Sequence, residues 1–365
     1  MNPALPPSKP IASLSPSAFE TLRECRLRAS FAQHAQGPGP PRTPQQALGD
    51  LCHAVLEELA RSGAIRRDDW EQAIDPLWLA TTKRIAGAVL AEPHDASLAL
   101  APELWPGYAI KRARLRKAAG RLHDLLAGAR ADAELICEAP LATGDGRLHG
   151  RPDLIVRGRD ESWIVDFKSG AVMDRDRRTP REAYVRQLQL YALLEAAVSG
   201  RWPSRGFLVP LNGPVVEVPI EEAAATALGE QAHQAITDFN AVVPATQPAS
   251  PSPGTCAYCP WTPICSAFWQ AADASWEGTL PAAAGVVRSA NETRPGSITL
   301  VVDVEAGSVS AGVITILNLS PTEHPTAMQL QAGDKVALVG LRRLQRDDEL
   351  ALPAWGQLAL HAAGT

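Results

Sequence analysis

The stretches Gly150–Val156, with the sequence GRPDLIV, and Trp163–Gly170, with the sequence WIVDFKSG, decide the fold of this chain. Both are short apolar runs of the kind that form strands, and the polar segment RGRDES between them is typical of a hairpin turn. Residues two apart in a strand point to the same face, so Asp166 and Lys168 are expected to project together. Asp153, at the start of the preceding strand, is expected to reach the same pocket across the hairpin.

Asp153 and Asp166 are the basis of a metal-site hypothesis. Two carboxylates in one pocket repel each other unless a cation lies between them, and Mg²⁺ or Mn²⁺ is a cation that such oxygen ligands favour. A metal held in this way activates water and stabilises the charge that develops on an attacked phosphodiester. The ammonium of Lys168 would orient that water. The alternative is that the D-x-K tripeptide is an ion pair on a surface strand.

The segments around this hairpin predict a mixed α/β fold, because the hydrophobic period changes from 3.6 to 2 and back. Ser15 or Ser17 is expected to cap a first helix that carries Cys25, and Gly63 and Gly200 are expected to end later helices. The predicted helices lie within 13–33, 47–63, 63–130, 180–200 and 221–241. Three strands, of which the hairpin forms the last two, precede the helix that ends at Gly200, and two short strands follow it.

A series of motifs within 13–270 resembles, in the same order, the RecB-like branch of the PD-(D/E)XK nuclease superfamily. The motifs are S-x-S-x-F-E-T-L-R-E-C ending at Cys25, G-D-L-C-H-A-V-L-E with His53, E-A-P at Glu138, H-G-R-P-D-L-I-V with Asp153, I-V-D-F-K-S-G with Asp166 and Lys168, Q-L-Q-L-Y-A-L-L with Gln187 and Tyr191, and C-A-Y-C-P-W-T-P-I-C. The resemblance implies a restriction-endonuclease-like nuclease core with added helices. The second acid is Asp where many members of the family have Glu.

The resemblance also implies roles for the residues nearest the chemistry. Asp153 and Asp166 would bind the catalytic Mg²⁺ or Mn²⁺, and Lys168 would position the attacking water. His53 would be a further metal ligand or a histidine that orders the site. The alternative for His53 is a structural histidine on an amphipathic helix.

Three more residues are assigned to the site by the same resemblance. Gln187 and Tyr191 lie one helical turn apart, so they share a face and would line the site and touch DNA or water. Glu138 would lie nearby. The alternative for Gln187 and Tyr191 is that they form the polar edge of a packed helix.

Half of the six cysteines crowd into the stretch TCAYCPWTPIC. Cys256, Cys259 and Cys265 have C-x2-C-x5-C spacing, which indicates a metal site in a chain with no predicted secretion signal. A zinc ribbon would offer a second C-x-x-C nearby, and none is present. In RecB-like iron–sulfur nucleases such a trio joins a cysteine of an N-terminal helix, so the resemblance implies that Cys25 completes the ligands of a [4Fe–4S] cluster. Zinc on the same four cysteines is the alternative.

The chain from about 285 to 365 is expected to form a small all-β unit that resembles an OB-fold in its strand pattern. Its one aromatic residue, Trp355, is a poor platform for single-stranded DNA. Docking of a helicase or repair partner is therefore as well supported as DNA binding. The predicted organisation is a loose N-terminus over 1–12, a nuclease domain over 13–270 with a linker at 244–254, and this β unit.

Composition limits the function classes further. The chain has 365 residues, 45% hydrophobic and 21% charged, which predicts folded domains and excludes global disorder. A net charge of −5 excludes a globally basic nucleic-acid binder, but two basic segments, 111–121 and DRDRRTPRE (174–182), are candidates for phosphate contacts. The alternative is that their charges are solvated or paired. No transmembrane run and no signal-like start are found, so a cytoplasmic location is expected.

These observations predict a metal-dependent deoxyribonuclease that hydrolyses phosphodiester bonds. By the resemblance it would be an exonuclease that acts on single-stranded DNA or DNA ends in repair, recombination or defence. The sequence has no G-x4-G-K-[ST] motif, so unwinding would have to come from a partner. The alternatives are a nuclease fold kept for DNA or protein docking, and a zinc-stabilised scaffold.

Overall fold

The structure is a computed structural model. It describes residues 9–34, 42–91, 96–159, 161–174, 178–242, 247–310, 312–346, 348–353 and 356–361. Trp355, most of the predicted loose N-terminus and parts of the predicted linker and of the second basic segment lie outside these ranges. Among the described helices, none is both long and apolar enough to cross a membrane.

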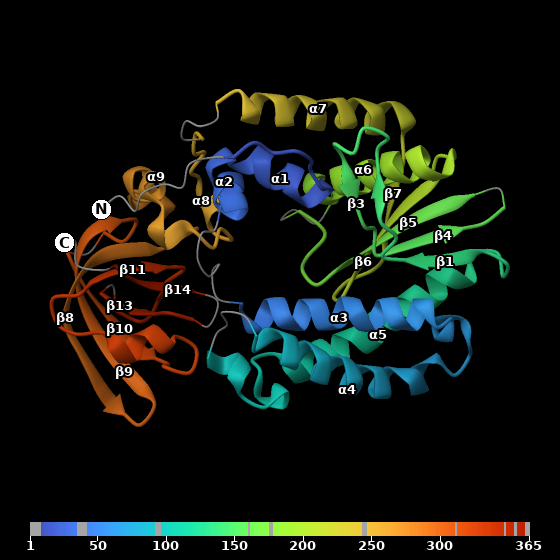
Figure 1. The fold of residues 1–365 in the computed structure, drawn as a ribbon. Helices are drawn as coiled ribbons and strands as arrows, with labels where there is room; N and C mark the ends of the chain where they lie inside the picture. The colour runs from blue at the N-terminus through green and yellow to red at the C-terminus, as the bar shows by residue number, and fades with distance from the viewer. Residues whose placement is uncertain are drawn as a thin grey trace.

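A mixed sheet lies at the centre of the N-terminal part of the chain (Figure 1). In the described part of the chain it has five strands in the order β1-β4-β5-β6-β7, namely β1 (Glu134–Cys137), β4 (Leu154–Arg157), β5 (Ser162–Lys168), β6 (Arg205–Pro210) and β7 (Val216–Pro219). β4 and β5 pair antiparallel with Leu154 opposite Val165, so the predicted hairpin is confirmed. β5 and β6 pair in parallel. β2 (Leu141–Ala142) and β3 (His149–Gly150) form a separate short ribbon.

Helices cover both faces of this sheet, as Figure 1 shows. On one face are α3 (Pro44–Arg61), α4 (Trp70–Val89) and α5 (Tyr108–Ala127), and on the other are α1 (Pro16–Glu24), α6 (Glu182–Ser199) and α7 (Glu222–Asn240). Strand β5 separates the two cores. Val165 and Phe167 are buried in the core with α3–α5, whereas Ile164 is buried in the core with α6 and α7. The alternation of side chains therefore turns Asp166 and Lys168 towards α6.

The first helix differs from the prediction. Ser15 caps α1, since its Oγ accepts a hydrogen bond from the N–H of Ala18, but α1 ends at Glu24. Cys25 has extended backbone with φ −160°, and α2 (Arg26–His34) begins after it. The prediction that Cys25 lies on a helix is therefore wrong. The N–H of Leu27 bonds to the carbonyl of Pro248 instead of to α1, so a distant part of the chain contacts the break.

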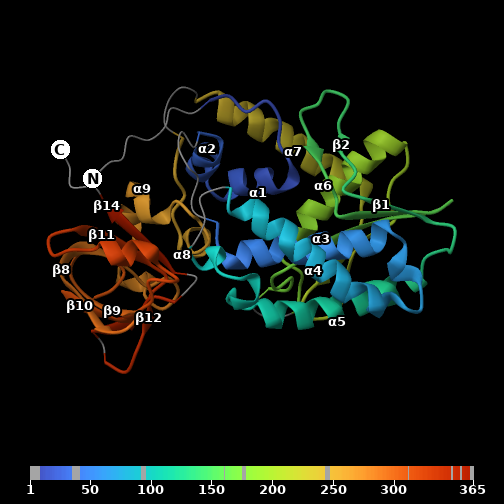
Figure 2. The ribbon, with the colours of Figure 1, turned by 60° about the horizontal axis from the view of Figure 1, so that its bottom comes forward.

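The C-terminal part begins with α8 (Pro253–Cys256) and α9 (Ser266–Ala271) and continues as a sheet that curls into a half-barrel (Figure 2). Its described strands follow the order β12-β13-β10-β9-β8-β11-β14. They are β8 (Ala282–Arg294), β9 (Ser297–Gly307), β10 (Val313–Leu319), β11 (Lys335–Val339), β12 (Arg342–Arg343), β13 (Glu349–Ala351) and β14 (Gln357–His361). The all-β prediction is confirmed, with the first strand three residues earlier than expected. The OB-like identity stays a prediction.

Candidate metal centre and active site

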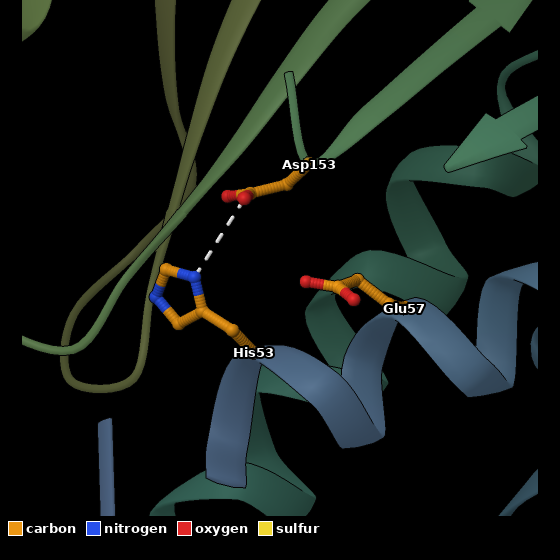
Figure 3. Close-up of side chains that lie close together, drawn as sticks. All are labelled: His53, Glu57 and Asp153. Carbon is orange, nitrogen blue, oxygen red and sulfur yellow. Dashed lines mark ion pairs between the residues drawn. The ribbon is translucent and has the colours of Figure 1, made fainter. Parts of the chain in front are cut away.

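Asp153 is fixed to the neighbouring strand by its own carboxylate. It lies just before β4, and its Oδ2 accepts a hydrogen bond of 2.5 Å from the backbone N–H of Phe167 in β5. This bond uses one carboxylate oxygen and leaves Oδ1 directed towards α3 (Figure 3). The position of Asp153 across the hairpin is as the sequence predicts.

Asp166 and Lys168 meet on the α6 side of β5. The Asp166 side chain is 3% exposed, and one of its oxygens is in direct contact with the Lys168 ammonium. Lys168 Nζ also donates to Gln187 Oε1 at 2.8 Å, and Gln187 Nε2 donates to the Tyr191 hydroxyl at 3.3 Å. The structure thus brings four of the predicted site residues into one continuous chain of contacts from β5 to α6.

Tyr184 is a residue of this site that the sequence prediction missed. The Lys168 ammonium lies 4.6 Å from the centre of the Tyr184 ring, a cation–π distance. Tyr184 precedes Gln187 by three residues on α6, so the helical spacing that selected Gln187 and Tyr191 could have identified it.

His53 and Glu57 approach Asp153 from α3 (Figure 3). His53 Nδ1 lies 3.7 Å from Asp153 Oδ1. One ligand atom from each of His53, Glu57 and Asp153 lies within 4.8 Å of the others, which is close enough for all three to bind one metal ion. The sequence prediction included His53 but not Glu57. The signal was present, since residues four apart on a helix share a face.

Glu138 has a strained backbone beside the site. It follows β1 with φ 54°, a left-handed conformation that residues other than glycine rarely adopt. Its N–H donates to the carbonyl of Asp153 at 3.3 Å, which joins the two segments. Outliers of this kind often occur at functional sites. The geometry agrees with the prediction that Glu138 lies near the site.

The acidic side chains raise one another's pKa values. Burial raises the pKa of Glu57 to about 7, and the charges of Glu138 and Asp153 add to the effect. Burial also raises the pKa of Asp166, although Lys168 opposes the rise. For His53 burial lowers the pKa, but the bond to Asp153 and the charges of Asp153 and Asp166 outweigh it, so the net shift is upward. Several carboxylates and an imidazole in one place are the donors that a divalent cation needs, so these residues fit the metal of the hypothesis.

The comparison with protein families decides the classification. The model of the PD-(D/E)XK nuclease superfamily matches residues 13–266, which include every residue of the site above. This chain belongs to the PD-(D/E)XK nuclease superfamily. Membership in this superfamily suggests a phosphodiesterase with a nucleic-acid substrate.

Two other comparisons add little to the superfamily assignment. No curated protein matches the chain. Among solved structures, one titled "Crystal structure of SSO0001" is 18% identical over 68% of this chain and 94% of that chain, with a TM-score of 0.25.

Four cysteines of this superfamily member line one cavity. Cys25, at the break between α1 and α2, shares this cavity with Cys256 at the end of α8, with Cys259, and with Cys265 just after the 3₁₀ turn Thr262–Ile264. Cys256 and Cys259 are buried, and Cys25 and Cys265 are half-buried. Burial raises the pKa of Cys256 to about 11, and the neighbouring cysteines, Cys25 included, add to this rise. Burial likewise raises the pKa of Cys259 and of Cys265, so these three thiols hold their protons unless a cation displaces them.

The basic helix predicted to contact phosphates is mostly committed to internal contacts. Arg112 and Arg116 both pair with Asp75 of α4, at 2.9 and 2.7 Å. Lys111 and Arg121 donate to backbone carbonyls just after β5 and at the end of β6, at 3.1 and 2.6 Å. For these four residues the geometry favours the alternative interpretation, pairing within the protein, over contact with DNA. Lys111 and Arg121 hold α5 against the sheet that carries the site, and Arg112 and Arg116 hold it against α4.

Proposed function

We propose that this superfamily member is a metal-dependent deoxyribonuclease of the RecB-like branch. It hydrolyses phosphodiester bonds as an exonuclease on single-stranded DNA or DNA ends. The single observation that carries the proposal is the convergence of Asp153, Asp166 and Lys168 with His53 at the end of one hairpin. A role in repair, recombination or defence and a cytoplasmic location belong to the same proposal.

Asp153, Asp166 and His53 would hold the Mg²⁺ or Mn²⁺. When bound, the cation supplies Lewis-acid chemistry, because it activates water and offsets charge on the phosphate. Lys168 is held between Asp166 and Gln187, and its ammonium would donate a hydrogen bond to the attacking water and keep that water in line with phosphorus.

Residues around this set would complete the active site. Gln187 accepts a hydrogen bond from the Lys168 ammonium and would hold it in place. A shift of α6 along its axis would break this bond. Tyr191 would support Gln187 through its hydroxyl, and Glu138 would keep Asp153 in place through the backbone.

We also propose that Cys25, Cys256, Cys259 and Cys265 ligate a [4Fe–4S] cluster. Their shared cavity supports a common ligand. Zinc on the same four cysteines is the competing occupant, and the visible spectrum separates the two.

The chain would divide into a nuclease domain over 13–270 and a β domain over 285–365. The β domain would receive a helicase or repair partner, which would supply the unwinding.

Cleavage of end-labelled single- and double-stranded DNA by protein purified without oxygen tests the nuclease. Mg²⁺ and Mn²⁺ are compared, with Lys168→Ala as the inactive variant and Lys83→Ala, an exposed lysine of α4, as the matched control. We expect the parent and the control to cleave and Lys168→Ala to be inactive. Labelling each end in turn shows the polarity.

Circular dichroism checks that Lys168→Ala is folded, and Lys168→Gln replaces it if it is not. If cluster-loaded parent protein cleaves neither substrate, the proposal is contradicted. That result favours the alternative of a nuclease fold kept for DNA or protein docking. The visible spectrum of the same preparation tests the cluster, because an iron–sulfur protein is brown and a zinc protein is colourless.

A further inference from the structure

We propose that Glu57 is a ligand of the active-site cation, so that α3 contributes a His53–Glu57 pair and Asp153 completes a site that prefers Mn²⁺ to Mg²⁺. The inference rests on the proposed function, because it concerns the cation of the same site. It adds to the proposed ligands Asp153, Asp166 and His53 a third carboxylate, which α3 carries.

The first argument is the geometry of α3. His53 and Glu57 are four residues apart, so both side chains leave the same face of the helix, and in Figure 3 both point towards Asp153. The ligand atoms of the three residues lie within 4.8 Å of one another. The backbone at this turn is held against β1, since Cys137 Sγ lies 3.5 Å from the carbonyl of Glu57.

The second argument is that, among the described residues, the arginine nearest Glu57 is shared with a closer carboxylate. Arg61 is one turn further along α3, but it lies 2.6 Å from Glu58 and only 3.9 Å from Glu57. The negative charges of Glu138 and Asp153 act on Glu57 more strongly than the opposing charges of His53 and Arg61. The ionised form of a carboxylate that is only 16% exposed and faces two others is unfavourable unless a cation joins them.

The choice of cation follows from the donor atoms. Mg²⁺ prefers oxygen ligands in a strict octahedron and dehydrates reluctantly. Mn²⁺ accepts the same carboxylates and stands above Mg²⁺ in its acceptance of an imidazole nitrogen. A site with one imidazole among its carboxylates should therefore bind Mn²⁺ more tightly.

The test measures Mn²⁺ binding to the full-length, cluster-loaded protein by titration with detection of free Mn²⁺ in electron paramagnetic resonance. Glu57→Gln keeps the size of the side chain and removes its charge, and Glu58→Gln is the matched control on the next residue. Replacing a residue that holds a metal ligand in place commonly lowers the metal affinity by about 10–100-fold. Loss of a ligand itself should therefore raise the dissociation constant for Mn²⁺ by at least about tenfold. Glu58→Gln should bind as the parent does, and the parent should bind Mn²⁺ more tightly than Mg²⁺.

Mn²⁺ binding by Glu57→Gln equal to that of the parent overturns the inference and leaves Glu57 a structural residue. If Glu57→Gln does not fold, Glu57→Asp decides, because it keeps the charge and shortens the reach. Parent-like binding by that variant would then count against direct ligation. Lys168→Gln separates the two proposals, since it should lose cleavage and keep Mn²⁺. If the parent protein never cleaves DNA but Glu57→Gln binds Mn²⁺ more weakly than the parent, only the proposed nuclease activity is refuted.

Discussion

At the scale of single residues, the two oxygens of Asp153 have different neighbours. Oδ2 is bound to the backbone of β5, whereas Oδ1 faces His53. The carboxylate therefore cannot rotate freely, and its open oxygen is directed at α3. This preorganisation places a ligand without a further loss of side-chain entropy when a cation binds.

The raised pKa of Glu57 predicts how the metal-free protein responds to pH. The folded value of about 7 lies above the ordinary 4.5, so the folded state holds this proton more tightly than the unfolded state does. The contribution of Glu57 to stability is present below about pH 4.5 and is lost as the pH rises through about 7. We expect the melting temperature of metal-free protein to fall over this window, and Glu57→Gln to reduce the fall. An equal fall in parent and variant would show that Glu57 is not the group responsible.

The residue scale also shows what sequence could and could not predict. Asp166 and Lys168 share a face because a strand alternates with period two, so their contact follows from local geometry. Glu57 shares a face of its helix with His53 and Glu58 does not, so the spacing separates the two. That this face meets Asp153 depends on a distant hairpin, which no local pattern specifies.

At the scale of elements, the contact of the β2–β3 ribbon with α6 depends on Gly150. A Cβ at this position would lie 2.9 Å from Tyr191 Cε1 and 3.1 Å from Leu194 Cδ1. The glycine therefore allows a close approach that brings the ribbon against the helix carrying Gln187.

Gly150→Ala should lower the free energy of unfolding by about 1–3 kcal/mol, the usual cost of overpacking. It should also reduce cleavage, because Tyr191 would have to move away from Gln187. Gly144→Ala is the matched control, since nothing lies within 4 Å of its Cβ. Urea denaturation and the DNA assay together check both effects, and equal stability of the two variants would contradict the argument.

Element boundaries were predicted well where glycine marks them and poorly where a tertiary contact does. The left-handed Gly63 and Gly200 lie at helix ends as the sequence indicates. The interruption at Cys25 has no such marker, because the pattern of apolar residues continues from α1 into α2. It depends instead on the bond from Leu27 to Pro248. The order of strands in the C-terminal sheet likewise depends on pairing that no local pattern specifies.

At the scale of the whole molecule, the cysteine segment (residues 256–265) lies between the sheet that contains β5 and the C-terminal sheet. Cys256 is buried in a cluster with Phe268, Leu280 and Val339, the last of which belongs to β11. Gln357 of β14 donates to the carbonyl of Cys259 at 3.1 Å. The C-terminal sheet thus packs on the segment that would hold the cluster.

Loss of the cluster should therefore loosen the C-terminal sheet. In Cys265→Ser we expect lower iron content and faster amide hydrogen exchange in β14 and around Leu280, because the segment they pack against loses its ligand. Exchange in α4, whose apolar side chains are buried in the core with α3 and α5, should not change. Unchanged exchange in β14 despite loss of iron would show that the packing holds by itself.

The ends of the nuclease-like unit are joined over a long sequence distance. The N–H of Ile11 bonds to Asn240 Oδ1 at 2.7 Å across 229 residues, and Cys25 shares its cavity with cysteines still later in the chain. At translation rates of about 5–20 residues per second, the first helices would wait roughly 10 to 50 seconds for these partners. Their apolar faces are exposed to chaperones in that interval. A nascent chain stopped before Cys256 would already contain the catalytic hairpin but not the contacts that hold α1 and α2 in place.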